Sequence, residues 1–235
     1  MSKIIENEQL SRDFFLMTIQ YPNDAKMGQF CMLRGWGSYP VLSRPISVFD
    51  SNHETISFMY KIAGEGTALL AAKKPGDSVT LQGPLGNAFP FVTGRVAMVG
   101  GGVGVAPLHY AAKELKKAGG CTVDLYLGFS DKALLVEKYE KTADKVTVDV
   151  GGFITDKIDP AAYDVIFTCG PEVMMKVLYN KCEAAGKADA LHVSIENRMA
   201  CGIGACLVCS CKTISGNKKA CKDGPVLKGS EVFSI

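Results

Sequence analysis

The residues best able to carry chemistry are cysteines gathered near the C-terminal end of the sequence. Five of the nine cysteines fall between positions 201 and 221. Cys201, Cys206 and Cys209 follow a C-x4-C-x2-C spacing, and Cys221 comes twelve positions after the third. This is the ligand spacing of a plant-type 2Fe–2S centre, which needs four thiolates. Two glycines between the first two cysteines permit left-handed turns and let backbone N–H groups approach sulfur.

The choice of ligands leaves alternatives open. Zinc also binds four cysteines, but its usual signature is a pair of C-x2-C hooks, and only one is present. Cys211 is ambiguous, because it competes with Cys209 or Cys221 as a ligand. We prefer Cys221, since Cys209 already follows Cys206 at the expected spacing. The remaining cysteines are interpreted as small buried hydrophobic residues; they are Cys31, Cys121, Cys169 and Cys182.

A glycine-rich turn, Gly100-Gly-Gly-Val-Gly-Val-Ala-Pro107, lies between an expected strand and an expected helix. Such a turn brings a pyrophosphate to backbone N–H groups at a helix N-terminus, where the helix dipole favours negative charge. It is not the G-x-G-x-x-G fingerprint, because Pro107 occupies the last position. Proline suits the first helical turn. A tight turn that binds no ligand is the alternative interpretation.

A second loop of this kind, Thr168-Cys-Gly-Pro171, also joins a strand to a helix. Two such loops at the carboxyl ends of neighbouring parallel strands would frame a nicotinamide-binding crevice. The predicted NAD-binding residues are Gly100, Gly101, Gly102, Gly104, Pro107, Cys169, Gly170 and Pro171.

The N-terminal half contains two weaker motifs. Arg44-Pro-Ile-Ser47 places a guanidinium, which suits bidentate pairing with a phosphate, beside a hydroxyl that could reach a flavin edge. Gly66-Thr67 opens a short helix and offers free N–H groups to a diphosphate. For either motif alone, an ordinary surface residue is the commoner explanation.

These motifs need strands and helices that position them, and the predicted pattern of these elements changes near residue 94. Up to about Phe91 it reads as short β segments separated by turns, which predicts an antiparallel barrel or sandwich. From there, strands at 96–99, 122–128, 145–150, 164–168 and 191–195 alternate with helices at 107–117, 132–142 and 171–185. That alternation predicts βαβ units with a parallel sheet. The last forty residues have neither pattern and hold the cysteine cluster.

The expected fold class is therefore an α+β multidomain protein. We expect an antiparallel β-barrel flavin domain over residues 1–93 and an α/β parallel-sheet nicotinamide domain over residues 94–196. A small 2Fe–2S domain over residues 197–235 completes the chain.

Composition narrows the functional classes. The 26 basic and 24 acidic residues leave a net charge of +2, which gives no reason to expect nucleic acid as a partner. No signal peptide and no apolar run of about 18 residues is present, so we expect a soluble cytoplasmic protein that does not enter a membrane. The three histidines are dispersed and form no acid–base constellation. We therefore expect the substrate-oxidising chemistry to reside in another polypeptide.

Taken together and in order, these motifs resemble the ferredoxin reductase superfamily. The closer resemblance is to the electron-transfer subunits of class 1B dihydroorotate dehydrogenases. It covers essentially the whole chain, and the cysteine block, with Cys221-Lys-Asp-Gly-Pro-Val226 after it, is its most specific part.

The resemblance implies three cofactors, namely FAD, a 2Fe–2S cluster and NAD. The implied FAD-binding residues are Arg44, Pro45, Ile46, Ser47, Met59, Tyr60, Lys61, Gly66 and Thr67. The implied partner is an FMN-containing catalytic subunit that oxidises dihydroorotate in pyrimidine biosynthesis, in a heterotetramer. Electrons would pass from FMN through the cluster and FAD to NAD+. Ile46 departs from the wider superfamily, where an aromatic ring often stacks on the flavin, and Tyr60 is a possible substitute.

Other functions remain as alternatives. A related NAD(P)H-dependent reductase serving ferredoxin or sulfur metabolism shares this layout. The reductase of an aromatic-ring oxygenase fits less well, since the eleven residues between Cys209 and Cys221 are few for its ferredoxin domain. A zinc-stapled interaction module would leave the glycine loops unexplained. Asp131 after the second parallel strand could accept from a ribose diol, which favours NAD over NADP.

Overall fold

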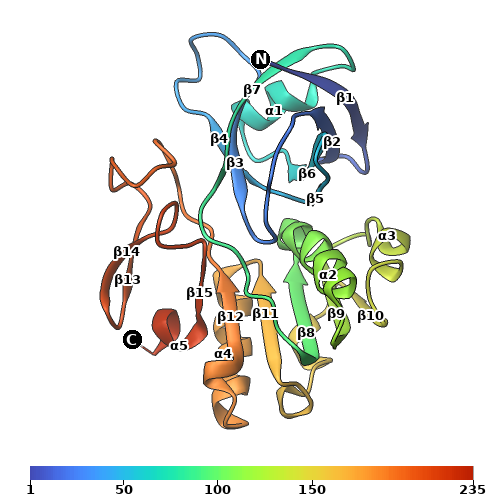
Figure 1. Cartoon of the computed structure of the whole chain (residues 1–235), viewed down its shortest axis with the longest axis vertical. Helices are drawn as coiled ribbons and strands as arrows, with labels where there is room; N and C mark the ends of the chain where they lie inside the picture. Colours follow the sequence, from blue (N-terminus) through green and yellow to red (C-terminus); the bar gives the residue numbers. More distant parts are fainter. Residues whose placement is uncertain (235) are drawn as a thin grey trace.

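The computed structural model describes residues 1–234, which form two sheets with a small C-terminal lobe beside them (Figure 1). A seven-stranded sheet occupies the N-terminal part, a six-stranded sheet follows, and a two-stranded hairpin lies near the C-terminus. The predicted fold class is confirmed: an antiparallel domain, a parallel-sheet domain and a cysteine-rich lobe. The residue numbers at which we divide the three domains stay a prediction.

The N-terminal sheet is antiparallel and has the order β4-β3-β7-β1-β2-β6-β5. Its strands span Ser2–Gln9 (β1), Phe14–Gln20 (β2), Phe30–Arg34 (β3), Arg44–Ser47 (β4), Asp50–Ser51 (β5), Thr55–Lys61 (β6) and Ser78–Leu85 (β7). Strand β4, at one end of this order, contacts β6 near the other end, so the sheet curls into a barrel. Fully buried apolar side chains such as Met17, Ile19 and Phe58 fill its interior.

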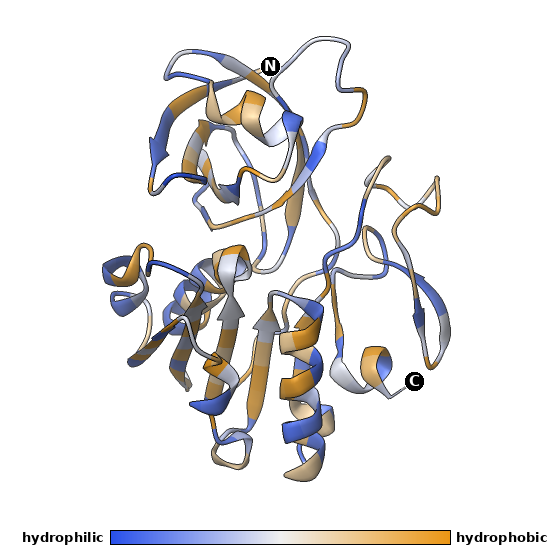
Figure 2. Ribbon diagram, turned by 180° about the vertical axis from the view of Figure 1, so that it is seen from behind, coloured by the Kyte–Doolittle hydropathy of each residue, from blue (hydrophilic) through white to orange (hydrophobic). Residues whose placement is uncertain are grey.

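The second sheet has the order β10-β9-β8-β11-β12-β15, and its first five strands are parallel. These five strands span Gly94–Gly101 (β8), Cys121–Phe129 (β9), Lys145–Val150 (β10), Val165–Cys169 (β11) and Leu191–Ser194 (β12). Helix α2 (Ala106–Ala118) covers one face and α4 (Glu172–Ala184) covers the other (Figures 1 and 2). The central strands are apolar, as expected of strands buried on both faces. Their carboxyl ends point toward the barrel.

Short helical segments complete these two parts of the chain. They are α1 (Glu65–Ala71), η1 (Gly102–Val105), α3 (Val136–Glu140), η2 (Ile154–Asp156), η3 (Pro160–Ala162) and η4 (Ala188–Ala190). The prediction of a helix over 132–142 is wrong in its first turn. Leu135 has a left-handed backbone with φ of 56°, which an α-helix cannot contain, and the preceding Leu134 is buried in the core.

The C-terminal segment, for which the sequence showed no pattern, contains regular structure. A hairpin joins Ser210–Thr213 (β13) to Gly216–Lys219 (β14), and helix α5 spans Gly229–Phe233. Between them, Val226–Lys228 (β15) returns to the six-stranded sheet and pairs antiparallel with β12. Strands of three or four residues are too short to show a hydrophobic period, which explains why the sequence did not reveal them.

This returning segment is held by Asn87, in the connection between the two sheets. The Asn87 amide donates hydrogen bonds to the carbonyls of Val226 (2.6 Å) and Asp223 (3.2 Å) and accepts one from the Val226 N–H (2.9 Å). On the barrel side, a Cβ added to Gly202 would lie 2.9 Å from the Met32 side chain. The cysteine-rich lobe therefore contacts the barrel directly and is tied to the connection between the sheets.

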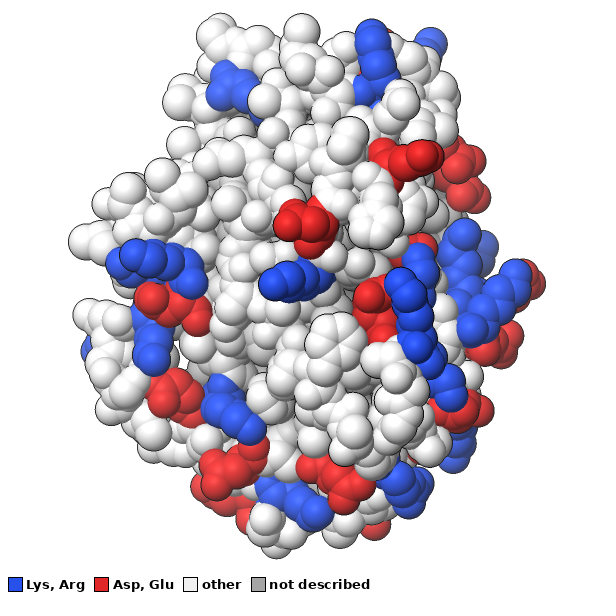
Figure 3. Space-filling model, viewed as in Figure 1, with Lys and Arg blue, Asp and Glu red and all other residues white. Residues whose placement is uncertain are grey.

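Two further features concern the length of the helices and the charge of the surface. Within residues 1–234, no helix is long and apolar enough to cross a membrane. On the face in Figure 3, basic and acidic side chains are interspersed rather than separated into large areas of one sign.

We predict that Asn87→Ala destabilises the protein, because it leaves three backbone groups of the returning segment without their partner. The expected loss is about 2 kcal/mol, a fall in the midpoint of thermal unfolding of roughly 4–8 °C for a chain of this size. Asn217→Ala, at an exposed hairpin position, is the matched control. Equal midpoints for the two variants would contradict the role of Asn87.

Candidate functional site

The four cysteines chosen from the sequence come together as two pairs of sulfur atoms. The Sγ atoms of Cys209 and Cys221 are 3.2 Å apart, and both residues are buried. The Cys206 thiol lies within hydrogen-bonding reach of the Cys201 sulfur, nearer the surface. A binuclear iron–sulfur cluster needs four thiolates, two on each iron, so two pairs are the donor arrangement it requires.

Backbone N–H groups point at these sulfurs. The N–H of Gly204 donates to Cys221 Sγ (3.0 Å), and that of Cys206 donates to Cys201 Sγ (3.4 Å). The pKa of Cys201 falls to about 6, mainly because the backbone N–H groups of Ile203 and Cys206 stabilise its thiolate. Burial, with the adjacent Cys209, raises the pKa of Cys221 to about 11. Such a thiol loses its proton when a metal coordinates it.

Over residues 1–234, no three His, Cys, Asp or Glu side chains form a group that could hold a metal ion, so the four cysteines form two pairs. Cys211 is directed elsewhere, since its thiol donates to the Lys218 carbonyl across the hairpin (3.4 Å). These positions support Cys221 over Cys211 as the fourth ligand, and the ligand set stays a prediction.

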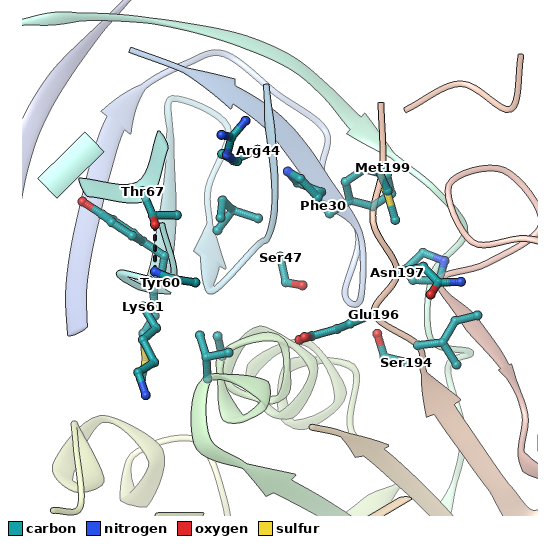
Figure 4. A pocket seen from close by; sticks show the side chains of 18 residues that line it. Phe30, Arg44, Ser47, Tyr60, Lys61, Thr67, Ser194, Glu196, Asn197 and Met199 are labelled. Atoms are coloured by element: carbon teal, nitrogen blue, oxygen red, sulfur yellow. Dashed lines mark hydrogen bonds between the residues drawn. The ribbon is translucent and has the colours of Figure 1, made fainter. Parts of the chain in front are cut away.

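A cavity of about 310 Å³ opens where the barrel, the α/β domain and the C-terminal lobe meet (Figure 4). Eight of the nine predicted FAD-binding residues line it, from β4, β6 and the start of α1; they are Arg44, Pro45, Ile46, Ser47, Met59, Tyr60, Lys61 and Thr67. The ninth, Gly66, packs against one of them, because a Cβ there would lie 2.5 Å from Arg44 Nε.

Two polar groups in this set are already engaged within the protein. The Thr67 hydroxyl accepts hydrogen bonds from the N–H groups of Ala63 (2.9 Å) and Gly64 (3.2 Å), which fixes the first turn of α1. The Tyr60 hydroxyl donates to Asn7 (3.0 Å), and burial raises its pKa. Ser47 makes no side-chain hydrogen bond within residues 1–234, and Arg44 donates one N–H to the Leu42 carbonyl and lies over the Trp36 ring. The other N–H groups of Arg44 and the Ser47 hydroxyl are therefore the polar groups left for a cofactor.

The opposite wall of this cavity contains residues that sequence reasoning missed. Ser194 ends β12, and Glu196, Asn197 and Met199 lie between β12 and the first cysteine ligand. The available signal was a pair of polar residues, Glu196-Asn197, at the carboxyl end of a parallel strand, where ligands bind in α/β sheets. Asn197 also links this wall to the cysteine loop, because its amide donates to the Cys209 carbonyl (3.3 Å).

A second cavity, of about 450 Å³, lies between the barrel and the carboxyl ends of β8, β9 and β11. Five of the predicted NAD-binding residues line it; they are Gly101, Gly102, Gly104, Gly170 and Pro171. Asp131, proposed to bind ribose, lines it too. Of the other three, Gly100 and Pro107 shape the glycine turn from within: a Cβ on Gly100 would meet Val105 at 2.9 Å, and Pro107 is buried.

Cys169, the last of the eight, is completely buried and lines none of the three cavities described here. Its sulfur is 3.9 Å from a carboxylate oxygen of Glu196, and burial raises the pKa of both groups. Glu196 in turn lines both the first and the second cavity. Cys169 therefore contacts the Glu196 carboxylate from the buried side, and its assignment to the nicotinamide site stays a prediction.

A third cavity, of about 720 Å³, continues the second, with which it shares Gly101, Gly102 and Pro171. The loop after β10 and the first turns of α4 form its outer wall. Among its lining residues there is no lysine or arginine, and there is one acidic residue, Asp156. The three cavities lie next to one another along one path, because Lys61 and Glu196 line both the first and the second.

The arrangement of a cavity on an antiparallel barrel beside an α/β domain is that of a ferredoxin reductase. One solved structure, an NADH-dependent reduced ferredoxin-NADP oxidoreductase, superposes with a TM-score of 0.90 at 30% identity, covering 100% of this chain and 90% of that one. A ferredoxin reductase of carbazole 1,9a-dioxygenase shares the fold at 20% identity, with a TM-score of 0.71 over 82% of this chain and 67% of the other.

Sequence relatives define the family more narrowly. Residues 196–233 match the family described as the iron-sulfur cluster binding domain of dihydroorotate dehydrogenase B. The electron transfer subunit of dihydroorotate dehydrogenase B (NAD(+)) from Clostridium acetobutylicum is 44% identical over 99% of this chain and 96% of its own length. That from Clostridium perfringens is 39% identical over 98% and 96%. The chain belongs to the family of dihydroorotate dehydrogenase B electron transfer subunits.

The sulfur geometry generates a test of the ligand set. We expect Cys221→Ser to lose the cluster, measured as iron and sulfide content and as visible absorption of the purified protein. Cys211→Ser, on the same lobe and with its thiol bonded to the hairpin, is the matched control and should keep normal iron. The reverse pattern would show that the fourth ligand is wrongly chosen.

Proposed function

We propose that this chain is the electron transfer subunit of an NAD-linked dihydroorotate dehydrogenase and holds FAD and a 2Fe–2S cluster. One observation carries the proposal, the order of the sites along a single path. The cavity lined by the predicted FAD-binding residues has the cysteine loop on one side, through Asn197 and Met199, and the nicotinamide-side cavity on the other, through Lys61 and Glu196. A relay between a cluster and NAD requires that order.

The bound groups supply the electron chemistry, in which a cluster passes single electrons and a flavin exchanges a pair with nicotinamide as hydride. The chain contributes placement and screening. Arg44 provides a charge for the flavin phosphates, and Phe30, Ile46, Met59 and Met199 give the cavity apolar walls. In such surroundings the polar groups that remain act strongly, because water is excluded.

The third cavity supports NAD rather than NADP as the nicotinamide partner. A 2′-phosphate at the adenosine end needs a cation, usually arginine, whereas a ribose diol is satisfied by a carboxylate. No basic residue lines the cavity at that end, and its one carboxylate, Asp156, already pairs with Lys181 (3.0 Å). The carboxylate left for a ribose diol is Asp131 in the adjoining cavity, which Lys132 also lines. We therefore propose NAD+ as the electron acceptor.

The oxidation of dihydroorotate belongs, in this proposal, to a second polypeptide that contains FMN. None of the three histidines offers a base at the cavities: His109 is buried against Phe49, His192 bonds to Lys228, and His53 lies in a turn of the barrel.

The cysteine loop carries exposed apolar side chains, with Ile203 56%, Leu207 61% and Val208 54% exposed. Such a patch is typical of a docking surface.

We propose that the catalytic subunit covers this patch and that the two kinds of chain form a heterotetramer in the cytoplasm, serving pyrimidine biosynthesis. The second candidate, a reductase subunit serving ferredoxin, is favoured by the 30% identity to the ferredoxin-NADP oxidoreductase. A ferredoxin-NADP reductase needs a cation for the 2′-phosphate of NADP, and no lysine or arginine lines the third cavity, so this second candidate fits the site less well.

The isolated chain with its cofactors should oxidise NADH with an artificial electron acceptor and should not oxidise dihydroorotate. Adding the FMN-containing subunit should create dihydroorotate:NAD+ activity. Oxidation of dihydroorotate by the isolated chain would contradict the two-subunit proposal. Faster turnover with NADPH than with NADH would favour the ferredoxin alternative.

The apolar patch gives a test of docking. Val208→Gln should weaken binding to the catalytic subunit about tenfold, because a polar side chain in place of an exposed apolar one removes most of that residue's contribution to the free energy of binding. The visible spectrum should stay that of the unchanged protein, since Val208 is no ligand. Ile214→Gln, which is also exposed but lies at the far end of the hairpin, serves as control. Equal binding by both variants would place the partner elsewhere.

A further inference from the structure

The nicotinamide-side cavity has a second wall, which the motifs do not identify. This wall comes from the barrel, where the turn between β1 and β2 contributes Ser11, Arg12, Asp13 and Phe14. The turn has a fixed shape: the N–H groups of Leu10 and Ser11 donate to the Phe14 carbonyl (2.9 and 3.3 Å). The Gln9 amide donates to the Arg12 carbonyl (3.3 Å). Arg12 is thus presented from a rigid turn across the cavity from the glycine loop.

Six charged residues line this cavity, and they are not equally available; they are Arg12, Asp13, Lys61, Asp131, Lys132 and Glu196. Lys132, on the loop after β9, is a cation on the side of the α/β domain, and Arg12 is one on the side of the barrel. Asp13 pairs with Lys61 (3.4 Å), and the Lys61 ammonium also lies over the Phe14 ring. Within residues 1–234, the Arg12 guanidinium donates no hydrogen bond and no carboxylate lies within 4 Å of its nitrogens. An arginine side chain without a partner, lining a cavity, is suited to an anion that arrives with a ligand.

The position of this second cavity, between the other two, indicates which anion Arg12 would bind. The path begins at the flavin cavity and ends at the cavity without cations, and this one lies between them. A dinucleotide laid along the path has its nicotinamide at the first end and its adenosine at the other. Its diphosphate therefore falls in the middle, between the backbone N–H groups that precede α2 and the side chain of Arg12.

The geometry points to Arg12 as a positioning residue that clamps the diphosphate of NAD from the barrel side. This inference rests on the proposed function and deepens it, since the dinucleotide is then held by both domains. Arg12 supplies positive charge from the barrel side, opposite the glycine loop and Lys132 of the α/β domain. It touches no reacting atom, so it acts on dinucleotide binding and leaves hydride transfer to the bound nicotinamide unchanged.

The test uses the purified protein with flavin and cluster bound, in the forms wild type, Arg12→Ala, Arg12→Lys and Lys26→Ala. Lys26 is an exposed cation of the barrel that lines none of the three cavities, so its variant is the matched control. The dissociation constant of ADP-ribose should rise about tenfold in Arg12→Ala, less in Arg12→Lys, and not in Lys26→Ala. An unchanged constant in Arg12→Ala would overturn the inference.

Turnover with an artificial acceptor gives a second readout that a merely structural role would not reproduce. In Arg12→Ala, kcat/KM for NADH should fall about tenfold with kcat within twofold of wild type. For dihydronicotinamide riboside, which has no phosphate, kcat/KM should not change. An equal loss with both substrates would show that Arg12 acts through the flavin domain and overturn the inference. A wild type that binds ADP-ribose but does not oxidise NADH would instead contradict the proposed function.

Discussion

The whole arrangement depends on the return of the C-terminal segment to the junction between the two sheets. Chain order places the barrel first, the α/β domain second and the cysteines last, but a relay needs the cysteines beside the flavin cavity. Three features satisfy that need: the antiparallel pairing of β15 with β12, the hydrogen bonds of Asn87 to Val226, and the contact of Gly202 with Met32. Without them, the cavity would lose the wall formed by Met199 and Pro225.

A second close approach holds together the two loops of the nicotinamide-side cavity. The glycine turn after β8 and the loop after β11 touch through their backbones, since a Cβ on Gly104 would lie 2.4 Å from the Cys169 carbonyl oxygen. Any side chain at that position would push the two loops apart. Glycine is therefore required there by the contact between the loops as well as by access of a phosphate to N–H groups.

The sequence was informative where chemistry demands particular residue types at particular spacings. The cysteine spacing, the glycine turn and the alternation of strands and helices all led to the observed fold class, and most residues named for the cofactors line the cavities. Short elements were missed because a three-residue strand has no period. The left-handed Leu135 was missed because leucine normally favours a helix. Glu196 and Arg12 were missed because only the folded chain brings a strand end and a distant turn to one cavity.

The two sulfur pairs differ in a way that matches their places in the relay. Cys206 is exposed, and its neighbour Cys201 has a pKa lowered to about 6 by backbone N–H groups. Cys209 and Cys221 are buried, at 2% and 3% exposure, and the pKa of Cys221 is raised. The outer pair, Cys201 and Cys206, thus lies in the same loop as the exposed apolar patch that we propose the catalytic subunit covers. The inner pair reaches the flavin cavity, through Asn197 bonded to the Cys209 carbonyl. In the proposed relay, electrons would therefore enter at the exposed pair and leave toward the flavin from the buried pair.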